Sequence, residues 1–166
     1  ITNHRVSGKW LCGGASNAGG AILSRFFNTI EIDELSRQIN PELNSGLCLL
    51  PLPCKGERFP INDPDLEPIL LPRPISDSLY LHALFEGLAR IEARGWNKLA
   101  EFGVPAPNKI ITLGGGAKNP QWRRIRERAI GIPIKTCKQQ PAVGVANIAM
   151  AAIQGEDKKT VFSSHK

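Results

Sequence analysis

Apolar residues recur at helical spacing in three parts of the chain. The longest part runs from Ser76 to about Phe102, where apolar residues lie three or four positions apart. Two shorter segments, Asn119 to Ile130 and Ala142 to Gln154, have the same spacing. Each is followed by a glycine of the kind that ends helices, Gly131 and Gly155. The pattern predicts a helix in each range.

Shorter elements are predicted in the first forty residues. The apolar run Lys9–Cys12 predicts a short buried strand that leads into two glycines. We expect Ser16 or Asn17 to cap a helix that continues to about Asn28, because their side chains can accept a hydrogen bond from the first turn. Asp33 is expected to cap a second short helix in the same way.

The remaining segments predict strands and one long loop. Leu47–Leu52 is apolar throughout and predicts a buried strand, whereas the prolines of the range 53–74 predict an irregular segment. Lys109–Leu113 and Ile132–Lys135 predict two more strands, which alternate with the last two helices. Short connections between strands and helices of this kind favour an α/β fold class.

Composition limits the class of protein. The chain has 166 residues, of which 42% are hydrophobic and 22% charged, with a net charge of +6. These values are typical of one globular domain and exclude a disordered or collagen-like chain. No segment contains the roughly 18 uncharged residues that a membrane-spanning helix needs, so we expect no membrane partner.

The cysteines indicate a reducing compartment. Cys12, Cys48, Cys54 and Cys137 form no Cys-x-x-Cys pair, and no histidine completes a zinc pattern. Four cysteines are too few for a disulfide scaffold of this length. The chain begins with Ile1 rather than Met, so we expect a piece of a longer protein whose targeting signal cannot be read here.

One dense basic run is present, Arg123–Arg128, in which arginines surround Ile125 and Glu127. The conservative interpretation is a solvated helix face, and we therefore expect no nucleic-acid partner. The alternative is a non-catalytic module that binds nucleic acid or protein through this helix. A steep salt dependence of binding would favour that alternative.

Three consecutive glycines form the clearest candidate binding motif. Gly114–Gly116 follow a predicted strand and precede a predicted helix at Asn119. Without Cβ atoms, a ligand can approach the backbone closely beside helix N–H groups, although a tight turn alone would also need glycine. A dinucleotide site is disfavoured because the third glycine of that motif is missing, and Lys135 and Thr136 stand where it would have an acidic residue.

A second pair of glycines, Gly19 and Gly20, lies near the start of the first predicted helix. Each glycine in a helix costs about 1 kcal/mol relative to alanine. Either close packing or a nearby ligand would compensate for that cost. The three histidines are far apart in the sequence, and no pair of residues indicates a nucleophile with its base.

Three stretches, residues 10–20, 56–64 and 114–125, together resemble the C-terminal domain of the FGGY carbohydrate kinases. The first two are most similar to the plant and cyanobacterial branch that phosphorylates the pentuloses D-ribulose or D-xylulose. The resemblance implies an actin-like ATPase, ribonuclease-H-like fold, truncated at its N-terminal edge. Residues 1–166 would then be part of the nucleotide-binding domain, and the N-terminal sugar-binding domain would be absent.

The resemblance also implies a nucleotide site. Gly115 and Gly116 would lie against the adenosine, with Gly114 in the same turn. Asn119 would hydrogen-bond the base, and Trp122 would pack beside it. Gly19 would line the pocket from the opposite side.

The implied activity is an ATP-dependent phosphorylation of a pentulose, with ATP and Mg²⁺ as cofactors and the sugar as partner. The catalytic Asp and the phosphate-binding loop of the family are absent from this chain. We therefore expect no catalytic residue here and no kinase activity from the fragment alone. Cytosol or plastid stroma would fit the free thiols.

Overall fold

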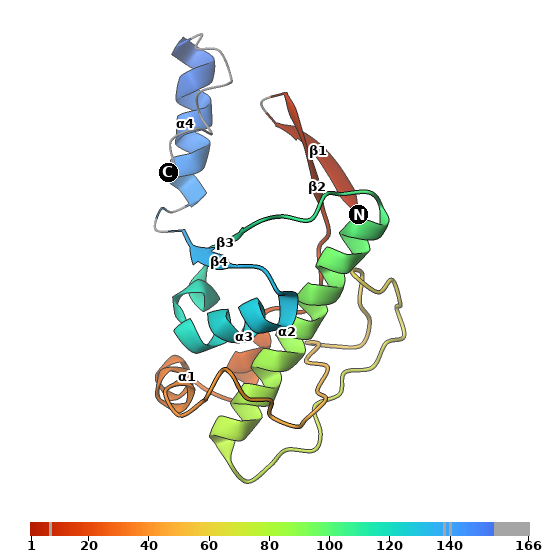
Figure 1. The fold of residues 1–166 in the computed structure, drawn as a ribbon, viewed down its shortest axis with the longest axis vertical. Helices are drawn as coiled ribbons and strands as arrows, with labels where there is room; N and C mark the ends of the chain where they lie inside the picture. Colours follow the sequence, from red (N-terminus) through yellow and green to blue (C-terminus); the bar gives the residue numbers. More distant parts are fainter. Residues whose placement is uncertain (7, 138, 140, 155–166) are drawn as a thin grey trace.

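The computed structural model describes residues 1–6, 8–137, 139 and 141–154 (Figure 1). Its elements, in chain order, are β1 (Thr2–Val6), β2 (Lys9–Gly13), the 3₁₀ helix η1 (Gly20–Arg25), α1 (Thr29–Ser36), α2 (Asp77–Glu101), β3 (Ile110–Thr112), the 3₁₀ helix η2 (Gly115–Lys118), α3 (Pro120–Ile130), β4 (Ile134–Thr136) and α4 (Pro141–Gln154). The predicted α/β fold class is confirmed. Strands β1 and β2 pair antiparallel, and β3 and β4 pair in parallel.

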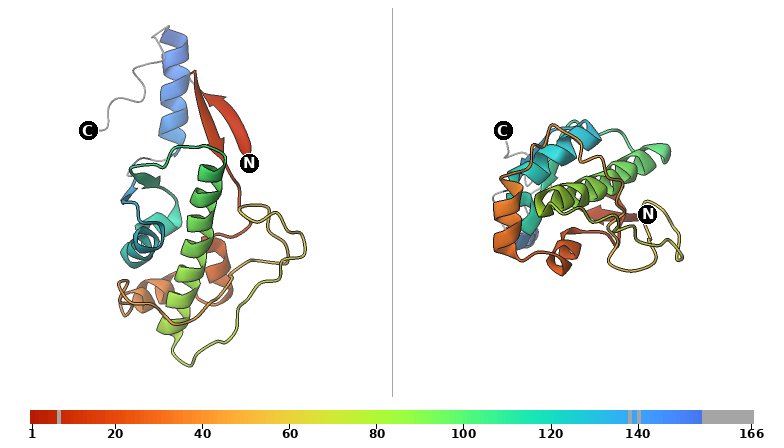
Figure 2. Two further views of the ribbon diagram at one scale, coloured as in Figure 1. Left: turned by 45° about the vertical axis from the view of Figure 1, so that its right-hand side comes forward. Right: turned by 90° about the horizontal axis from the view of Figure 1, so that it is seen from below.

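Helix α2 is the centre of the structure. Its start is fixed by Ser76, whose hydroxyl accepts a hydrogen bond from the backbone of Leu79. Every residue from Tyr80 to Ala89 is buried, so this part of the helix is covered on all sides. Helices α1 and α3, η1 and the segment 47–52 supply that cover (Figure 2).

Helix α3 crosses α2 and connects the two parallel strands. Its apolar side is provided by Ile125, which is fully buried, and by Trp122, whose ring stacks on Phe85 of α2. Asn119 caps the start of the helix, and Gly131 ends it with a left-handed backbone, as predicted. The predicted helices over 76–102, 119–130 and 142–154 are all present, while Gly155 lies outside the described residues.

The helix predicted from Ser16 or Asn17 to Asn28 is wrong in extent. Only η1 is helical there, and it begins at Gly20 without a side-chain cap. The backbone N–H of Asn17 donates instead to the carboxylate of Glu57, and the hydroxyl of Ser16 donates to the same group. These long-range hydrogen bonds hold the segment in a loop.

The predicted cap of the second helix is also wrong, because Asp33 lies inside α1. Asn28 is the cap: its side chain accepts from the backbone of Glu31, and the Glu31 carboxylate accepts from the backbone of Asn28. This reciprocal pair satisfies two of the helix's unpaired donors. The helix therefore begins after Asn28, which lies three positions before Glu31, and not after Asp33.

Within Leu47–Leu52, Leu49, Pro51 and Leu52 are buried as predicted, but Cys48 is exposed and the segment is not a strand. Only Leu50 forms a bridge, with Ile69, because prolines 51 and 53 cannot donate to a ladder. The segment packs on α2 at Gly87, where a Cβ atom would lie 2.6 Å from the Pro51 ring. The apolar composition therefore indicated burial correctly for part of the segment, but the strand that it predicted is wrong.

The β1–β2 hairpin and α4 extend to the same end of the molecule (Figures 1 and 2). Strand β2 was predicted as a buried strand, but Trp10 is 70% exposed and Leu11 also faces solvent. Strand β1 was not predicted. Helix α4 likewise exposes Val145 and Ile153.

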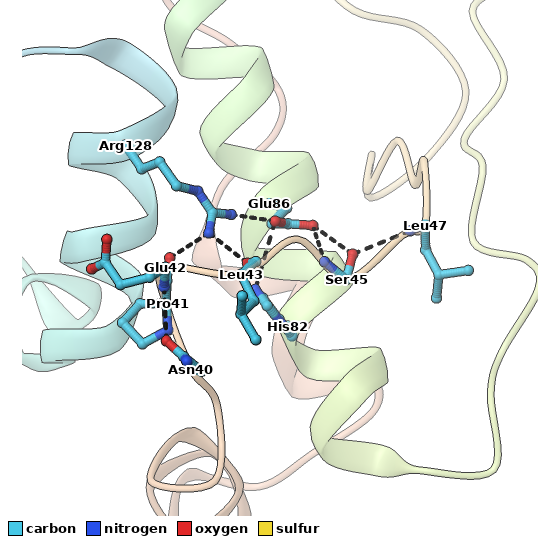
Figure 3. Close-up of polar contacts among 9 residues, drawn as sticks. All are labelled: Asn40, Pro41, Glu42, Leu43, Ser45, Leu47, His82, Glu86 and Arg128. Carbon is cyan, nitrogen blue, oxygen red and sulfur yellow. Dashed lines mark hydrogen bonds and ion pairs between the residues drawn. The ribbon is translucent and has the colours of Figure 1, made fainter.

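An ion cluster joins α2, α3 and the loop after α1 (Figure 3). The buried carboxylate of Glu86 pairs with Arg128 and accepts hydrogen bonds from the backbone and hydroxyl of Ser45. Arg128 also donates to the carbonyls of Pro41 and Leu43, both 2.5 Å away. The cluster thus fixes a loop without regular structure to two helices.

We predict that Arg128→Met lowers the free energy of unfolding by about 3 kcal/mol or more, because it leaves the Glu86 carboxylate buried and without its cation. Arg124→Met is the matched control, since Arg124 pairs with Glu42 at an exposed site and such pairs contribute under about 1 kcal/mol. Urea denaturation of both variants measures the difference. Equal losses of unfolding free energy in the two variants would contradict a stabilising role of the buried Arg128–Glu86 pair.

His82 is buried within the same cluster, with 6% of its surface exposed. Burial lowers its pKa below the usual value, and the nearby Arg128 guanidinium acts in the same direction. The Glu86 carboxylate, 3.6 Å from Nε2, and a hydrogen bond to the backbone of Leu43 act in the opposite direction but do not outweigh burial. The folded protein therefore holds His82 neutral at pH 7.

This burial predicts a pH dependence of stability. Because the folded pKa lies below the unfolded value of about 6.5, the unfolded chain binds more protons between the two values. Stability is therefore retained above about pH 6.5 and falls as the pH decreases through that window. His82→Gln should flatten the decline in unfolding free energy between pH 7 and 5, whereas His4→Gln on exposed β1 should not. Identical profiles in both variants would count against a buried neutral His82.

Candidate functional site

A cleft of about 1380 Å³ lies between two glycine-rich segments. One wall is formed by the segment after β2, within residues 12–24, and the other by the segment after β3, within residues 112–122. Helix α2 supplies the floor. Known ligand pockets measure about 300–1,000 Å³, so the cleft has room for a nucleotide-sized molecule.

The wall after β3 is bare backbone. Gly114 has a φ of +94°, a left-handed conformation that favours glycine, and it turns the chain from β3 into η2. Gly114 itself does not line the cleft, but Gly115 does. No atom lies within 4 Å of the position that a Cβ of Gly115 would occupy, so the space beside it is open to a ligand.

Gly116 also lines the cleft, but unlike Gly115 it has no open space where a Cβ would lie. A Cβ on Gly116 would overlap the ring of Trp122, and one on Gly20 would lie 3.1 Å from the same ring. The ring stacks on Phe85 with a centroid distance of 5.2 Å and an interplanar angle of 6°. Close packing therefore explains Gly116 and Gly20, and one face of Trp122 is occupied by Phe85.

Asn119 lines the cleft but its side chain is buried and bound on both sides. Its Oδ1 accepts from the backbone N–H of Trp122 at 2.9 Å, and its Nδ2 donates to the Ser36 hydroxyl at 2.7 Å. The amide thus caps α3 and connects it to α1. One N–H and one lone pair of this amide remain beyond these two bonds.

The opposite wall contains Gly19, next to open space, as at Gly115. It is held by residues that sequence reasoning did not assign to the site, above all Glu57. In the sequence, the stretch around Glu57 indicates only the resemblance to the carbohydrate kinases and no role in the site. A glutamate in a proline-rich loop carries no local signal that it will meet Ser16, some forty positions away.

Three of the four arginines of α3, namely Arg124, Arg126 and Arg128, are engaged within the structure, whereas the buried Nε of Arg123 has no hydrogen-bond partner. Arg126 lines the cleft and binds both carboxylate oxygens of Glu92, at 2.6 and 2.8 Å, and the Thr112 hydroxyl. Arg124 and Arg128 pair with Glu42 and Glu86. This use of the charges in internal pairs removes the main support for an interaction module based on the basic run.

The described part of the chain has no group of three or more His, Cys, Asp or Glu residues that could hold a metal ion. The acidic side chains on its cleft lining are Asp33 and Glu92, and Glu92 is already paired with Arg126. Among the helices described, none combines the length and apolar character needed to cross a membrane. The arrangement supplies binding surfaces.

Residues 1–153 match the FGGY family of carbohydrate kinases, C-terminal domain. Three solved structures are similar in fold. A protein described as a xyloylose kinase from Brucella ovis is 24% identical, with a TM-score of 0.63, over 77% of this chain and 28% of its own. A ligand-bound xylulose kinase from Lactobacillus acidophilus is 20% identical, with a TM-score of 0.69, over 88% and 32%.

A gluconate kinase from Lactobacillus acidophilus is 21% identical, with a TM-score of 0.68, over 88% of this chain and 32% of its own. The chain thus spans about a third of the length of the kinases it matches. The match to the family covers nearly all of the described residues, and the predicted actin-like fold is confirmed. The chain belongs to the FGGY family of carbohydrate kinases, in the C-terminal domain, which has the actin-like, ribonuclease-H-like ATPase fold.

Proposed function

We propose that this chain is the nucleotide-binding part of an ATP-dependent sugar kinase that phosphorylates a pentulose, D-ribulose or D-xylulose. The observation that carries the proposal is the cleft with glycine backbone on both walls, open at Gly19 and Gly115. A planar base and its ribose need such a bare surface, because any side chain there would occupy their space.

The described residues supply recognition and orientation. Gly115 lets the adenosine approach the backbone at η2, and Gly19 borders it from the other wall. Lys118, exposed on the cleft lining, provides a positive charge for the phosphates. Holding a reactant in a fixed position in this way contributes much of the rate in phosphoryl transfer.

The role of Asn119 with the base remains a prediction. Its two internal hydrogen bonds leave one N–H and one lone pair for a ligand. Trp122, half-buried against Phe85, would border the base through its remaining surface. The side chains of both residues would therefore already be held in place before the nucleotide binds.

Bound ATP would supply the phosphoryl group, and Mg²⁺ would accompany its phosphates. The described residues contain no group of three or more His, Cys, Asp or Glu side chains that could hold the ion. Since the chain spans about a third of similar kinases, we propose that the catalytic Asp, the phosphate loop and most sugar contacts belong to the rest of a longer protein. This chain alone would then be inactive.

The pentulose substrate is supported by two neighbours described as xylulose kinases and by the stretches at 10–20 and 56–64, which resemble the plant and cyanobacterial branch. Cytosol or plastid stroma is the proposed location, in keeping with four cysteines that form no disulfide. Both compartments keep thiols reduced.

The activity is tested with the complete protein that contains this chain. We expect ATP-dependent phosphorylation of D-ribulose or D-xylulose, measured by coupled ADP release, with gluconate and glycerol as comparison substrates. Residues 1–166 alone should release no sugar-dependent ADP. Phosphorylation of gluconate in preference to both pentuloses would overturn the substrate proposal, and no ATP use with any sugar would overturn the kinase.

The glycine cleft is tested by a matched pair of substitutions in the complete protein. Gly115→Val should raise the Michaelis constant for ATP by about tenfold or more, which corresponds to ~1.4 kcal/mol, without lowering the melting temperature, because its side chain enters open space. The sugar constant should change little.

Gly116→Ala is the other member of the pair. Its Cβ would displace Trp122 from Phe85, so we expect a loss of about 1–3 kcal/mol in stability. The tryptophan fluorescence should change as well. An unchanged ATP constant in folded Gly115→Val would mean that the glycine turn does not contact nucleotide.

A further inference from the structure

Glu57 lies in the loop between α1 and α2, yet its side chain reaches the wall of the cleft after β2. Only 4% of the residue is exposed. Its Oε1 accepts from the backbone N–H groups of Asn17, Arg58 and Phe59, at 2.8, 2.7 and 3.2 Å. Its Oε2 accepts from the Ser16 hydroxyl at 2.7 Å. One carboxylate therefore organises two segments forty residues apart.

Further hydrogen bonds connect the same two segments. The Ser16 hydroxyl accepts from the backbone N–H of Ala18 at 2.9 Å. The Asn17 amide donates to the carbonyl of Gly56 at 3.0 Å and accepts from Nε of Arg58 at 2.7 Å. Residues 16–18 are thus held by backbone and side chain alike. They lead directly into Gly19 and Gly20.

The neighbouring ring of Phe59 fills the space below this wall. A Cβ on Gly14 would overlap the ring, and a Cβ on Gly95 of α2 would lie 2.9 Å from it. Phe59 therefore packs between the wall and the floor of the cleft, and it belongs to the cleft lining. The loop that carries Glu57 supports the site from behind.

The carboxylate is ionised although none of the described residues forms an ion pair with it. Burial raises its pKa, but the hydrogen bonds from Asn17, Ser16, Phe59 and Arg58 outweigh burial and hold the pKa below its usual value. A buried anion needs each of its donors, because an amide or a shorter side chain cannot accept the same set. The carboxylate therefore contributes two of the hydrogen bonds that hold residues 16–18, those from the Ser16 hydroxyl and the Asn17 backbone.

We propose that Glu57 is a positioning residue of the nucleotide site, whose carboxylate holds Ser16–Ala18 so that Gly19 and Gly20 form the wall of the cleft. The inference rests on the proposed nucleotide-binding function. It predicts that loss of the carboxylate lowers the affinity for nucleotide, although Glu57 is not itself among the residues that line the cleft.

The test uses the complete protein with Glu57→Gln and, as matched control, Asp65→Asn. Both replace a carboxylate by its amide in the same loop, but Asp65 is exposed and pairs with Lys55 at the surface. In Glu57→Gln the new amide N–H groups would face the N–H and O–H donors that now bind the carboxylate, so some of these hydrogen bonds would be lost. We expect the dissociation constant of MgADP, measured by calorimetry, and the ATP Michaelis constant to rise about tenfold. The sugar constant should stay within about twofold.

Ser16→Ala is a second, milder variant that keeps the test decisive if Glu57→Gln folds poorly. It removes one donor to the carboxylate and the acceptor of the Ala18 N–H, and it leaves the three N–H bonds to the carboxylate. We expect folded protein whose MgADP dissociation constant is raised about two- to tenfold. Amide hydrogen exchange in residues 16–20 should quicken in both variants and not in Asp65→Asn.

Two results would overturn the inference. Folded Glu57→Gln or Ser16→Ala with wild-type MgADP affinity would show that Glu57 supports stability only, while the proposed function would stand. A wild-type protein that binds no MgADP and phosphorylates no sugar would remove the proposed function and this inference together. The wild-type measurement therefore distinguishes the two failures.

Discussion

The burial of α2 is the constraint on which the rest of the structure depends. Residues 80–89 of this helix are buried on all sides, including His82 and Glu86, and the described residues contain no sheet broad enough to cover them. Helix α3, η1, α1 and a proline-rich segment each cover one side. The two wall segments of the cleft lead into η1 and α3. The packing of η1 and α3 on α2 therefore also fixes the position of the cleft walls.

The site consists chiefly of backbone that packing has brought into position. Gly115 and Gly19 leave space, whereas Gly116 and Gly20 let Trp122 lie close to the chain. Charged side chains near the cleft are used to hold elements together, as with Arg126 and Glu92. The chain therefore offers a shape and backbone groups to a ligand, which suits a part of an enzyme that binds rather than transfers.

Sequence patterns predicted the long helices because their information is local. The apolar spacing lies within the helices, and Gly131 directly follows the helix that it ends. The failures arose where distant residues decide the outcome. Residues 16–28 are mostly not helical because Glu57 accepts a hydrogen bond from the backbone N–H of Asn17. The partly buried segment 47–52 forms no sheet because proline removes backbone donors. The glycine motif at 114–116 could be found from sequence, but the opposite wall's support could not.

The hydrogen bond between Asn119 and Ser36 joins the two sides of the cleft. Asn119 belongs to the segment after β3, and Ser36 ends the helix that follows the segment after β2. A buried 2.7 Å contact of this kind sets the width of the cleft before any ligand arrives. A preformed opening leaves little conformational entropy for a ligand to remove, so its affinity is not reduced by the cost of ordering the walls.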